Sequence, residues 1–234
     1  MLMPAEVEAA ARRSWQRLAW VGVYAVAMGL LEAACVVYLR RLLMPAGYDP
    51  GKPLPPEFLE SGLARVELCR EACTLAMLLA VAWLAGSNLR SRIAFFFFAF
   101  GTWDVLYYVG LRWWTGWPAS VLDWDCLFLI PKPWYGPVLA PVLISGYFAL
   151  ACCVTLVREQ RGRPLRWGAL AIVTQLAAGT IWFWSFIKDA ERIGELGYDA
   201  AEYSWLLFLT GAIIGLAGLT LAARPVRVAE ALEL

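Results

Sequence analysis

Residues 133–157 read PWYGPVLAPVLISGYFALACCVTLV, 25 consecutive residues without a charged side chain. A bilayer core of about 30 Å is spanned by a helix of roughly 20 apolar residues. Charged residues divide the rest of the chain into five further apolar blocks of similar length, which lack the two-residue alternation of a membrane β-barrel. The pattern predicts six transmembrane helices, at residues 18–40, 63–86, 93–112, 137–157, 167–187 and 203–223.

The composition of the whole chain agrees with an all-α, polytopic membrane helical bundle. Of its 234 residues, 61% are hydrophobic and 17% are charged, against ~45–50% and ~25% in soluble domains. The chain contains no histidine, which excludes His-held haem or zinc, Ser-His-Asp triads and Cys-His dyads. No nucleotide-binding motif is present either, so no cofactor is evident from the sequence. A net charge of +1 gives no basic field for nucleic acid.

The basic residues predict how the helices are oriented. With six helices both termini lie on one side, which would hold eleven Arg and Lys residues, whereas the other side would hold eight. Because cytoplasmic loops are enriched in basic residues, we expect both termini in the cytoplasm. The expected organisation is a cytoplasmic segment at residues 1–17, a transmembrane domain at 18–223 and a cytoplasmic tail at 224–234.

The connection at residues 113–136 is unusually rich in tryptophan, with five of the chain's 13. Tryptophan prefers the level of the lipid headgroups, and the apolar run 126–131 is too short to cross the membrane. We expect an interfacial or shallow re-entrant segment that acts as a lid over the bundle, with Asp123, Trp124 and Asp125 as its candidate site residues. An amphipathic loop resting on lipid is the alternative.

Ionisable residues inside the predicted helices are the strongest functional signal, because such groups are costly at membrane depth. They are Glu32, Glu67, Arg70, Glu71 and Asp104. Glu32 and Asp104 each lie eight residues before the basic residue that ends their helix, about 12 Å below the outer boundary at 1.5 Å per residue. Glu71 reaches a similar layer from the opposite direction. We therefore expect Glu32, Glu71 and Asp104 to gather around Arg70, with Tyr107 and Tyr108 one turn away as hydrogen-bond donors.

The charges of this layer do not balance. Four acids and one arginine would carry a formal charge of −3, which a low-dielectric site does not hold without compensation. Either some of the acids are protonated, or a cation binds among them, and carboxylates without His or thiolate suit hard cations and protons. A buried salt bridge that fixes the register of the helices is the structural alternative. Which metal, if any, would bind is open.

Two stretches resemble a known group of proteins. Residues 100–108 read FGTWDVLYY, and residues 117–138 include WPAS and then WDCLFLIPKPWYGPV. Together they resemble a family of uncharacterised bacterial inner-membrane proteins. The resemblance implies a bacterial cytoplasmic membrane location, and that Asp104 and the Trp-rich segment form one unit. It implies no activity.

Three functions fit these features, and the sequence leaves open whether the chain is an enzyme. The first is an outward-facing intramembrane pocket that binds or moves a cation, a proton or a small solute. The second is a membrane enzyme acting on a lipid-borne or quinone-like substrate. The third is a structural or assembly subunit of a membrane complex. The expected partners are the lipid bilayer and another membrane protein or a second copy of this chain.

Overall fold

A computed structural model describes residues 4–43, 52–54, 58 and 61–224 of the chain. Within this part of the chain, six helices are long and apolar enough to cross a membrane, so the expected polytopic helical bundle is confirmed. The helices are α1 (Pro4–Leu43), α3 (Gly62–Ala85), α4 (Leu89–Thr115), α5 (Leu139–Gln160), α6 (Ala169–Ile187), α7 (Ala190–Leu196) and α8 (Trp205–Ala222), with a 3₁₀ turn at Tyr198–Ala200. The strands are β1 (Trp124–Phe128) and β2 (Trp134–Pro137).

The helix boundaries differ most from expectation at α1 and α4. Helix α1 begins at Pro4 rather than near residue 18, because the polar residues before the apolar block continue the same helix. Helix α4 begins after a capping box, in which the side chain of Asn88 accepts from the Ser91 N–H and Ser91 Oγ accepts from the Asn88 N–H. The helix ends at Gly116, whose φ of 76° is the left-handed conformation that glycine adopts most readily.

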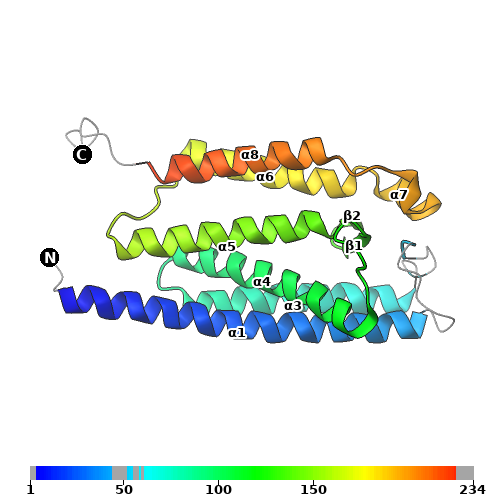
Figure 1. Cartoon of the computed structure of the whole chain (residues 1–234), viewed down its shortest axis with the longest axis horizontal. Helices are drawn as coiled ribbons and strands as arrows, with labels where there is room; N and C mark the ends of the chain where they lie inside the picture. Colours follow the sequence, from blue (N-terminus) through cyan, green and yellow to red (C-terminus); the bar gives the residue numbers. More distant parts are fainter. Residues whose placement is uncertain (1–3, 44–51, 55–57, 59–60, 225–234) are drawn as a thin grey trace.

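The helices run along one another in a single elongated bundle (Figure 1). Helices α1, α3 and α4 lie on one side, α5 packs on α4, and α6 and α8 pair on the far side. The first turn of α1 and the last turn of α8 lie at the same end of the bundle, as an even number of spans requires, and the β1–β2 hairpin lies towards the other end. The aromatic hairpin and the basic 158–166 connection are therefore at opposite ends.

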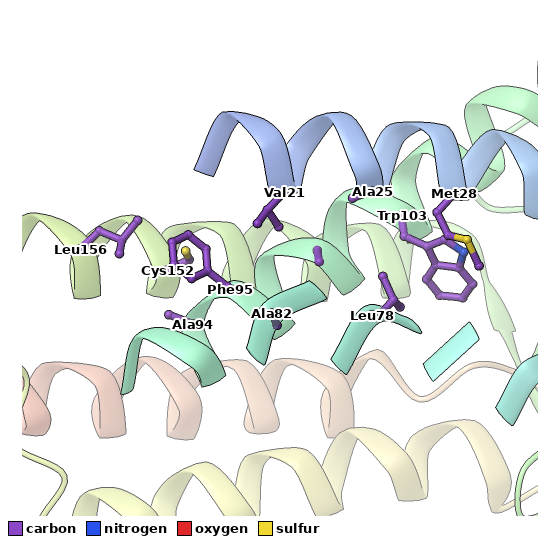
Figure 2. Packing of buried hydrophobic residues seen from close by; sticks show 11 residues of the cluster. Val21, Ala25, Met28, Leu78, Ala82, Ala94, Phe95, Trp103, Cys152 and Leu156 are labelled. Atoms are coloured by element: carbon purple, nitrogen blue, oxygen red, sulfur yellow. The ribbon is translucent and has the colours of Figure 1, made fainter. Parts of the chain in front are cut away.

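Small residues let α1 approach α4 closely. A Cβ atom at Gly29 would lie 2.5 Å from the Trp103 carbonyl oxygen, and one at Gly110 would lie 2.8 Å from Ala33 Cβ. Lipid tails are as apolar as the helix side chains, so the hydrophobic effect contributes little to the association of membrane helices. Small residues where two helices cross allow the close packing contacts that stabilise the association instead. Figure 2 shows the core beside this crossing, where Val21, Ala25 and Met28 of α1 meet residues of α3, α4 and α5.

Residues 113–136 contain a feature that the sequence analysis did not anticipate, an antiparallel hairpin. Strand β1 pairs with β2 from Trp124 opposite Pro137 to Phe128 opposite Trp134. The hairpin packs against its surroundings through aromatic rings, with Trp134 stacked on Phe186 and Trp124 stacked on Tyr198. The Trp-rich segment thus folds onto the bundle and does not stand free of it.

Candidate functional site

A cavity of about 80 Å³ lies between α1, α3, α4 and the hairpin. Its lining includes all seven residues that the sequence analysis selected from the helices: Glu32, Glu67, Arg70, Glu71, Asp104, Tyr107 and Tyr108. The hairpin segment contributes residues 126–129. The rest of the lining consists of Val36, Leu39, Arg40, Lys52, Leu54, Phe58, Trp103 and Tyr198. The predicted polar layer and the Trp-rich segment therefore form one site.

Arg70 is the cation at the centre of the ion pairs in this cavity. Its guanidinium donates to both carboxylate oxygens of Glu67, at 2.9 Å and 2.5 Å, and forms a salt bridge with Glu32. Thr74 donates to the second oxygen of Glu32 at 3.2 Å. The spacing of three residues within α3 brings Arg70 beside Glu67, while the packing of α1 against α3 supplies Glu32. Of the three acids expected around Arg70, Glu32 is the one in direct contact.

Glu71 fastens the hairpin to the bundle. The backbone N–H of Leu129 donates to both carboxylate oxygens of Glu71, at 3.1 Å and 3.0 Å. Glu71 is buried, and no cationic side chain among the described residues lies within 4.0 Å of it. A buried carboxylate accepts up to about four hydrogen bonds, so Glu71 keeps acceptor capacity towards the cavity.

Asp104 is held by a neighbour that the sequence analysis did not select. Ser145 of α5 donates to Asp104 Oδ2 at 3.0 Å. The serine reaches the aspartate because α4 and α5 approach closely at Gly101, where a Cβ atom would lie 3.0 Å from the Ser145 carbonyl oxygen. Asp104 is buried and, like Glu71, has no cationic side chain within 4.0 Å among the described residues. The expected contact with Arg70 is absent from the ion pairs of this part of the chain.

The predicted lid residues have different roles. Asp125 on β1 pairs with Arg40 at 3.3 Å and accepts from the Tyr108 hydroxyl at 3.2 Å. Burial raises the pKa of Asp125 to about 6, against the opposing effects of Arg40 and Tyr108. Asp123 closes the turn before the hairpin, because its Oδ2 accepts from the backbone N–H groups of Ala119 and Ser120.

Trp124, the third predicted lid residue, stacks on Tyr198 with ring centroids 5.8 Å apart. It does not line the cavity. Cys126 does line it, but burial and the neighbouring Asp125 raise the pKa of its thiol well above the usual range. Because the thiolate is the reactive and metal-binding form of cysteine, Cys126 is poorly suited to either role. The chemistry of this site rests on carboxyl groups.

Three residues of the site escaped the sequence analysis. The sequence predicts Arg40 only as the end of a helix, but Arg40 is buried, pairs with Asp125 and lies over the Trp117 ring at 4.5 Å. Ser145 carries no signal in a long apolar block. Trp103 lies in the FGTWDVLYY stretch, directly before Asp104, but its role depends on packing that a linear pattern does not contain.

The charges around the cavity remain unbalanced. In the described part of the chain, five carboxyl groups and three cationic side chains line the cavity or directly adjoin it, which gives a formal charge of −2. No group of three or more acidic or cysteine side chains in the described residues is close enough to hold a metal ion. The acids come from α1, α3, α4 and β1. Glu32 and Glu67 share Arg70, whereas Glu71, Asp104 and Asp125 each have other partners. The arrangement therefore suits a proton or a ligand that contacts the acids individually.

Comparisons with known proteins indicate neither a family nor a function for this chain. No family model, curated protein or solved structure matches this chain. The function is therefore inferred from Glu71 and Asp104, which form no ion pair with the described residues, from the aromatic lining and from the hairpin that lies against the cavity.

Proposed function

We propose that the protein is a binding protein of the bacterial cytoplasmic membrane, whose cavity opens to the outside and binds a small cationic solute. The main support for this proposal comes from two acids, Glu71 and Asp104, which line the same cavity and are both buried. Neither has a cationic partner within 4.0 Å among the described residues. A buried carboxylate without a counter-charge costs several kcal/mol. A bound cation would reduce that cost and would reduce the imbalance of charge around the cavity.

The alternative reading, a salt bridge that only fixes helix register, accounts for Arg70 with Glu32 and Glu67 but not for Glu71 and Asp104. A structural pair needs one acid for each base. Glu71 and Asp104 accept hydrogen bonds from the Leu129 N–H and the Ser145 hydroxyl, but these donors carry no formal charge and do not balance the two acids. Ligand binding would explain why Glu71 and Asp104 are acids, which packing alone does not explain.

Direct measurement of binding tests this proposal. Purified protein in lipid nanodiscs would be titrated with Na⁺, K⁺, Ca²⁺ and short alkylammonium salts, with calorimetry and thermal stability as readouts. We expect one of these cations to bind to the wild type and to bind about tenfold or more weakly to Glu71→Gln and Asp104→Asn, since a hydrogen bond to a charged group contributes about 1.5–3 kcal/mol.

Glu159→Gln is the matched control. It removes the acid of the partly exposed Arg90–Glu159 pair, 3.6 Å apart, which is not part of the cavity lining. Binding that is equal in all three variants would contradict a site at Glu71 and Asp104, as would the absence of binding by every cation tested.

The outward orientation follows from the distribution of basic residues and has its own test. Gly162 lies in the basic connection between α5 and α6, and Gly197 lies between α7 and the 3₁₀ turn, near the hairpin end of the bundle. Fusions at Gly162 should give a fluorescent cytoplasmic reporter, and fusions at Gly197 an active periplasmic phosphatase. The reverse pattern would place the cavity at the cytoplasmic side.

A membrane enzyme acting on a lipid-borne substrate is the second candidate, favoured by one observation. An apolar groove of about 590 Å³ lies beside α4, and its lining includes Val105, Val109, Val142 and the basic Arg112. Tyr108 lines both this groove and the polar cavity. An acyl or isoprenoid tail in the groove would bring its headgroup near the carboxyl groups, and a lipid that co-purifies with wild type but not with Val109→Trp would support this function.

A further inference from the structure

The apolar groove beside α4 has a lining that is almost wholly separate from that of the polar cavity. The groove measures about 590 Å³, and Tyr108 is the one described residue that lines both hollows. The hydroxyl of Tyr108 is engaged by Asp125 at 3.2 Å. A ligand of the groove would therefore be distinct from the cation of the proposed function.

The position of the groove indicates that lipid fills it. Its walls include residues of α4 and α5, which are both long and apolar enough to cross a membrane, and Val109 in the wall is 47% exposed. Val105, Val109 and Arg112 share one face of α4, because they are spaced four and three residues apart. At 1.5 Å per residue, Val105 lies about 10 Å along the helix from Arg112. An apolar wall of that length in a spanning helix suits the chain of a lipid.

Arg112 supplies the only charge in the described lining of the groove. Its Nη1 donates to the carbonyl oxygens of Gly116 and of Pro118, the latter at 3.0 Å. Pro118 also lines the groove, so these bonds hold the guanidinium beside the groove wall. They use at most two of the five N–H groups of a guanidinium. No acid among the described residues lies within 4.0 Å of Arg112.

A phosphodiester with no cationic group beside it matches this lining. Guanidinium N–H groups bind phosphate oxygens through charge-assisted hydrogen bonds, and a phosphodiester carries a single negative charge, equal and opposite to that of Arg112. The described lining contains no acid that would pair with the cationic group of choline or ethanolamine. Asp123 lies outside the lining, and its Oδ2 accepts from the backbone N–H groups of Ala119 and Ser120. The lining therefore favours a lipid of net negative charge over a zwitterionic one.

We infer that the groove binds one anionic phospholipid of the surrounding membrane, with an acyl chain against Val105 and Val109 and the phosphate on Arg112. This arrangement differs from that of a lipid-borne substrate, whose headgroup would lie near the carboxyl groups of the polar cavity. Here the headgroup lies at the level of Arg112, in the last turn of α4.

Lipid binding to the purified full chain tests this site. Delipidated protein in detergent would be titrated with phosphatidylglycerol or with phosphatidylcholine of the same chain length, and native mass spectrometry would count the bound lipids. We expect the first lipid to bind about fivefold more tightly as phosphatidylglycerol, which is the effect of one basic residue near an anionic headgroup. Equal affinity of the wild type for the two lipids would overturn the inference.

Variants separate the phosphate contact from the contact with the acyl chain. Arg112→Gln should remove the preference for phosphatidylglycerol, whereas Arg112→Lys, which keeps the charge, should retain most of it. Val109→Trp fills the apolar part of the groove and should weaken both lipids by the same factor. Arg41→Gln is the matched control, because Arg41 is an exposed basic residue in the last turn of α1 that does not line the groove. Thermal stability of each variant shows that it is folded.

Three results with these variants would overturn the assignment. A preference for phosphatidylglycerol that survives in Arg112→Gln would remove the phosphate contact. An equal loss in Arg41→Gln would indicate a general attraction of charge and not a site. Loss of the preference in Asp104→Asn would place the headgroup in the polar cavity, as expected of a lipid-borne substrate.

Cation binding in the same variants keeps this inference distinguishable from the proposed function. Arg112→Gln should bind the cation of the polar cavity with the affinity of the wild type, since Arg112 does not line that cavity. Failure of phosphatidylglycerol to prefer the wild type would thus leave the cation site standing. Absence of cation binding would likewise leave the lipid site standing.

Discussion

The two sides of this bundle are held together by different chemistry. Helices α1, α3 and α4 carry buried acids and the buried Arg40. They are joined to the hairpin by the Arg40–Asp125 ion pair and by hydrogen bonds of Tyr108 with Asp125 and of Glu71 with Leu129. The pair α6 and α8 contains no Asp, Glu, Lys or Arg at all. Both sides nevertheless form long helices in the same membrane-spanning bundle (Figure 1).

The α6–α8 pair shows what packing alone requires in this protein. Trp182 of α6 donates its indole N–H to the Phe208 carbonyl oxygen of α8 at 3.0 Å, and Gln175 donates to the Gly215 carbonyl oxygen at 2.8 Å. Gly211 lies directly against the Trp182 ring. Glycine contacts and neutral hydrogen bonds are thus sufficient to join two helices. The charges on the other side need a different explanation, and the proposed binding of a ligand would supply one.

The largest expected effect is the loss of Arg70. Arg70→Ala leaves Glu32 and Glu67 buried without their shared counter-charge, and breaking a buried pair costs about 3–5 kcal/mol of unfolding free energy. Thermal and denaturant unfolding of the purified variant measure this loss. Acidic pH should reduce the defect, because protonation of the two carboxyl groups removes the uncompensated charge.

Arg90→Ala provides the comparison for that measurement. Arg90 pairs with Glu159 at 3.6 Å and its side chain is 45% exposed, so its loss should cost less than about 1 kcal/mol. Equal stability of Arg70→Ala and Arg90→Ala at neutral pH would show that the charged side of the bundle does not depend on its ion pairs.

A smaller effect is expected on the neutral side, from Gly211→Ala. The added methyl group would lie 2.8 Å from the Trp182 ring, and overpacking of this kind costs about 1–3 kcal/mol. Gly215→Ala is the control on the same helix, because its nearest neighbour would be 3.5 Å away. Unfolding should distinguish the two variants, while the affinity of the cavity for its cation should be the same in both.

The sequence predicted the helices well because the physical requirement is simple. A block of about 20 apolar residues between charges has few alternatives in a bilayer, and Lys132 to Arg158 or Glu202 to Arg224 meet that requirement without ambiguity. The candidate site was predicted for a similar reason. Charged residues at membrane depth turn towards the interior, which brought Glu32, Glu71 and Asp104 to one cavity.

What the sequence did not reveal depends on contacts between distant residues. Nothing local indicates that Ser145 rather than Arg70 would meet Asp104, since this depends on the close approach of α4 and α5 at Gly101. The hairpin was missed because its strands are short and lie in a segment whose tryptophans equally suit a membrane interface. Its pairing with the Glu71 carboxylate is made through a backbone N–H, which every residue except proline possesses.

The ionisation of Asp125 provides a further test at the junction of hairpin and bundle. Its pKa of about 6 lies above the 3.8 of the unfolded chain, because burial disfavours the charged form. The folded protein therefore holds this proton more tightly, and the resulting stability is complete below pH 3.8 and is lost as the pH rises to about 6.

Asp125→Asn mimics the neutral form at every pH and should not show this loss. We expect the stability of the wild type relative to Asp125→Asn to fall by about 1–2 kcal/mol between pH 4 and pH 6, measured by denaturant unfolding. Asp189→Asn, which removes the acid of the Lys188 pair outside the cavity lining, should run parallel to the wild type. A difference between wild type and Asp125→Asn that is constant with pH would contradict the burial of this carboxyl group.

The smallest expected effect concerns the hairpin itself and separates its attachment from the stability of the helices. Glu71→Gln keeps the shape of the side chain but replaces an ionised acceptor of the Leu129 N–H. Since charged hydrogen bonds are about twice as strong as neutral ones, the hairpin should open about fivefold more often, which corresponds to about 1 kcal/mol. Hydrogen exchange read at the Leu129 amide measures this directly, and the amides of α6 and α8 in the same sample should keep their wild-type rates. Faster exchange throughout the bundle would mean that Glu71 supports the whole fold. An unchanged rate at Leu129 would mean that the Glu71 carboxylate does not hold the hairpin. In that case the aromatic contacts hold it, namely Trp134 on Phe186 and Trp124 on Tyr198.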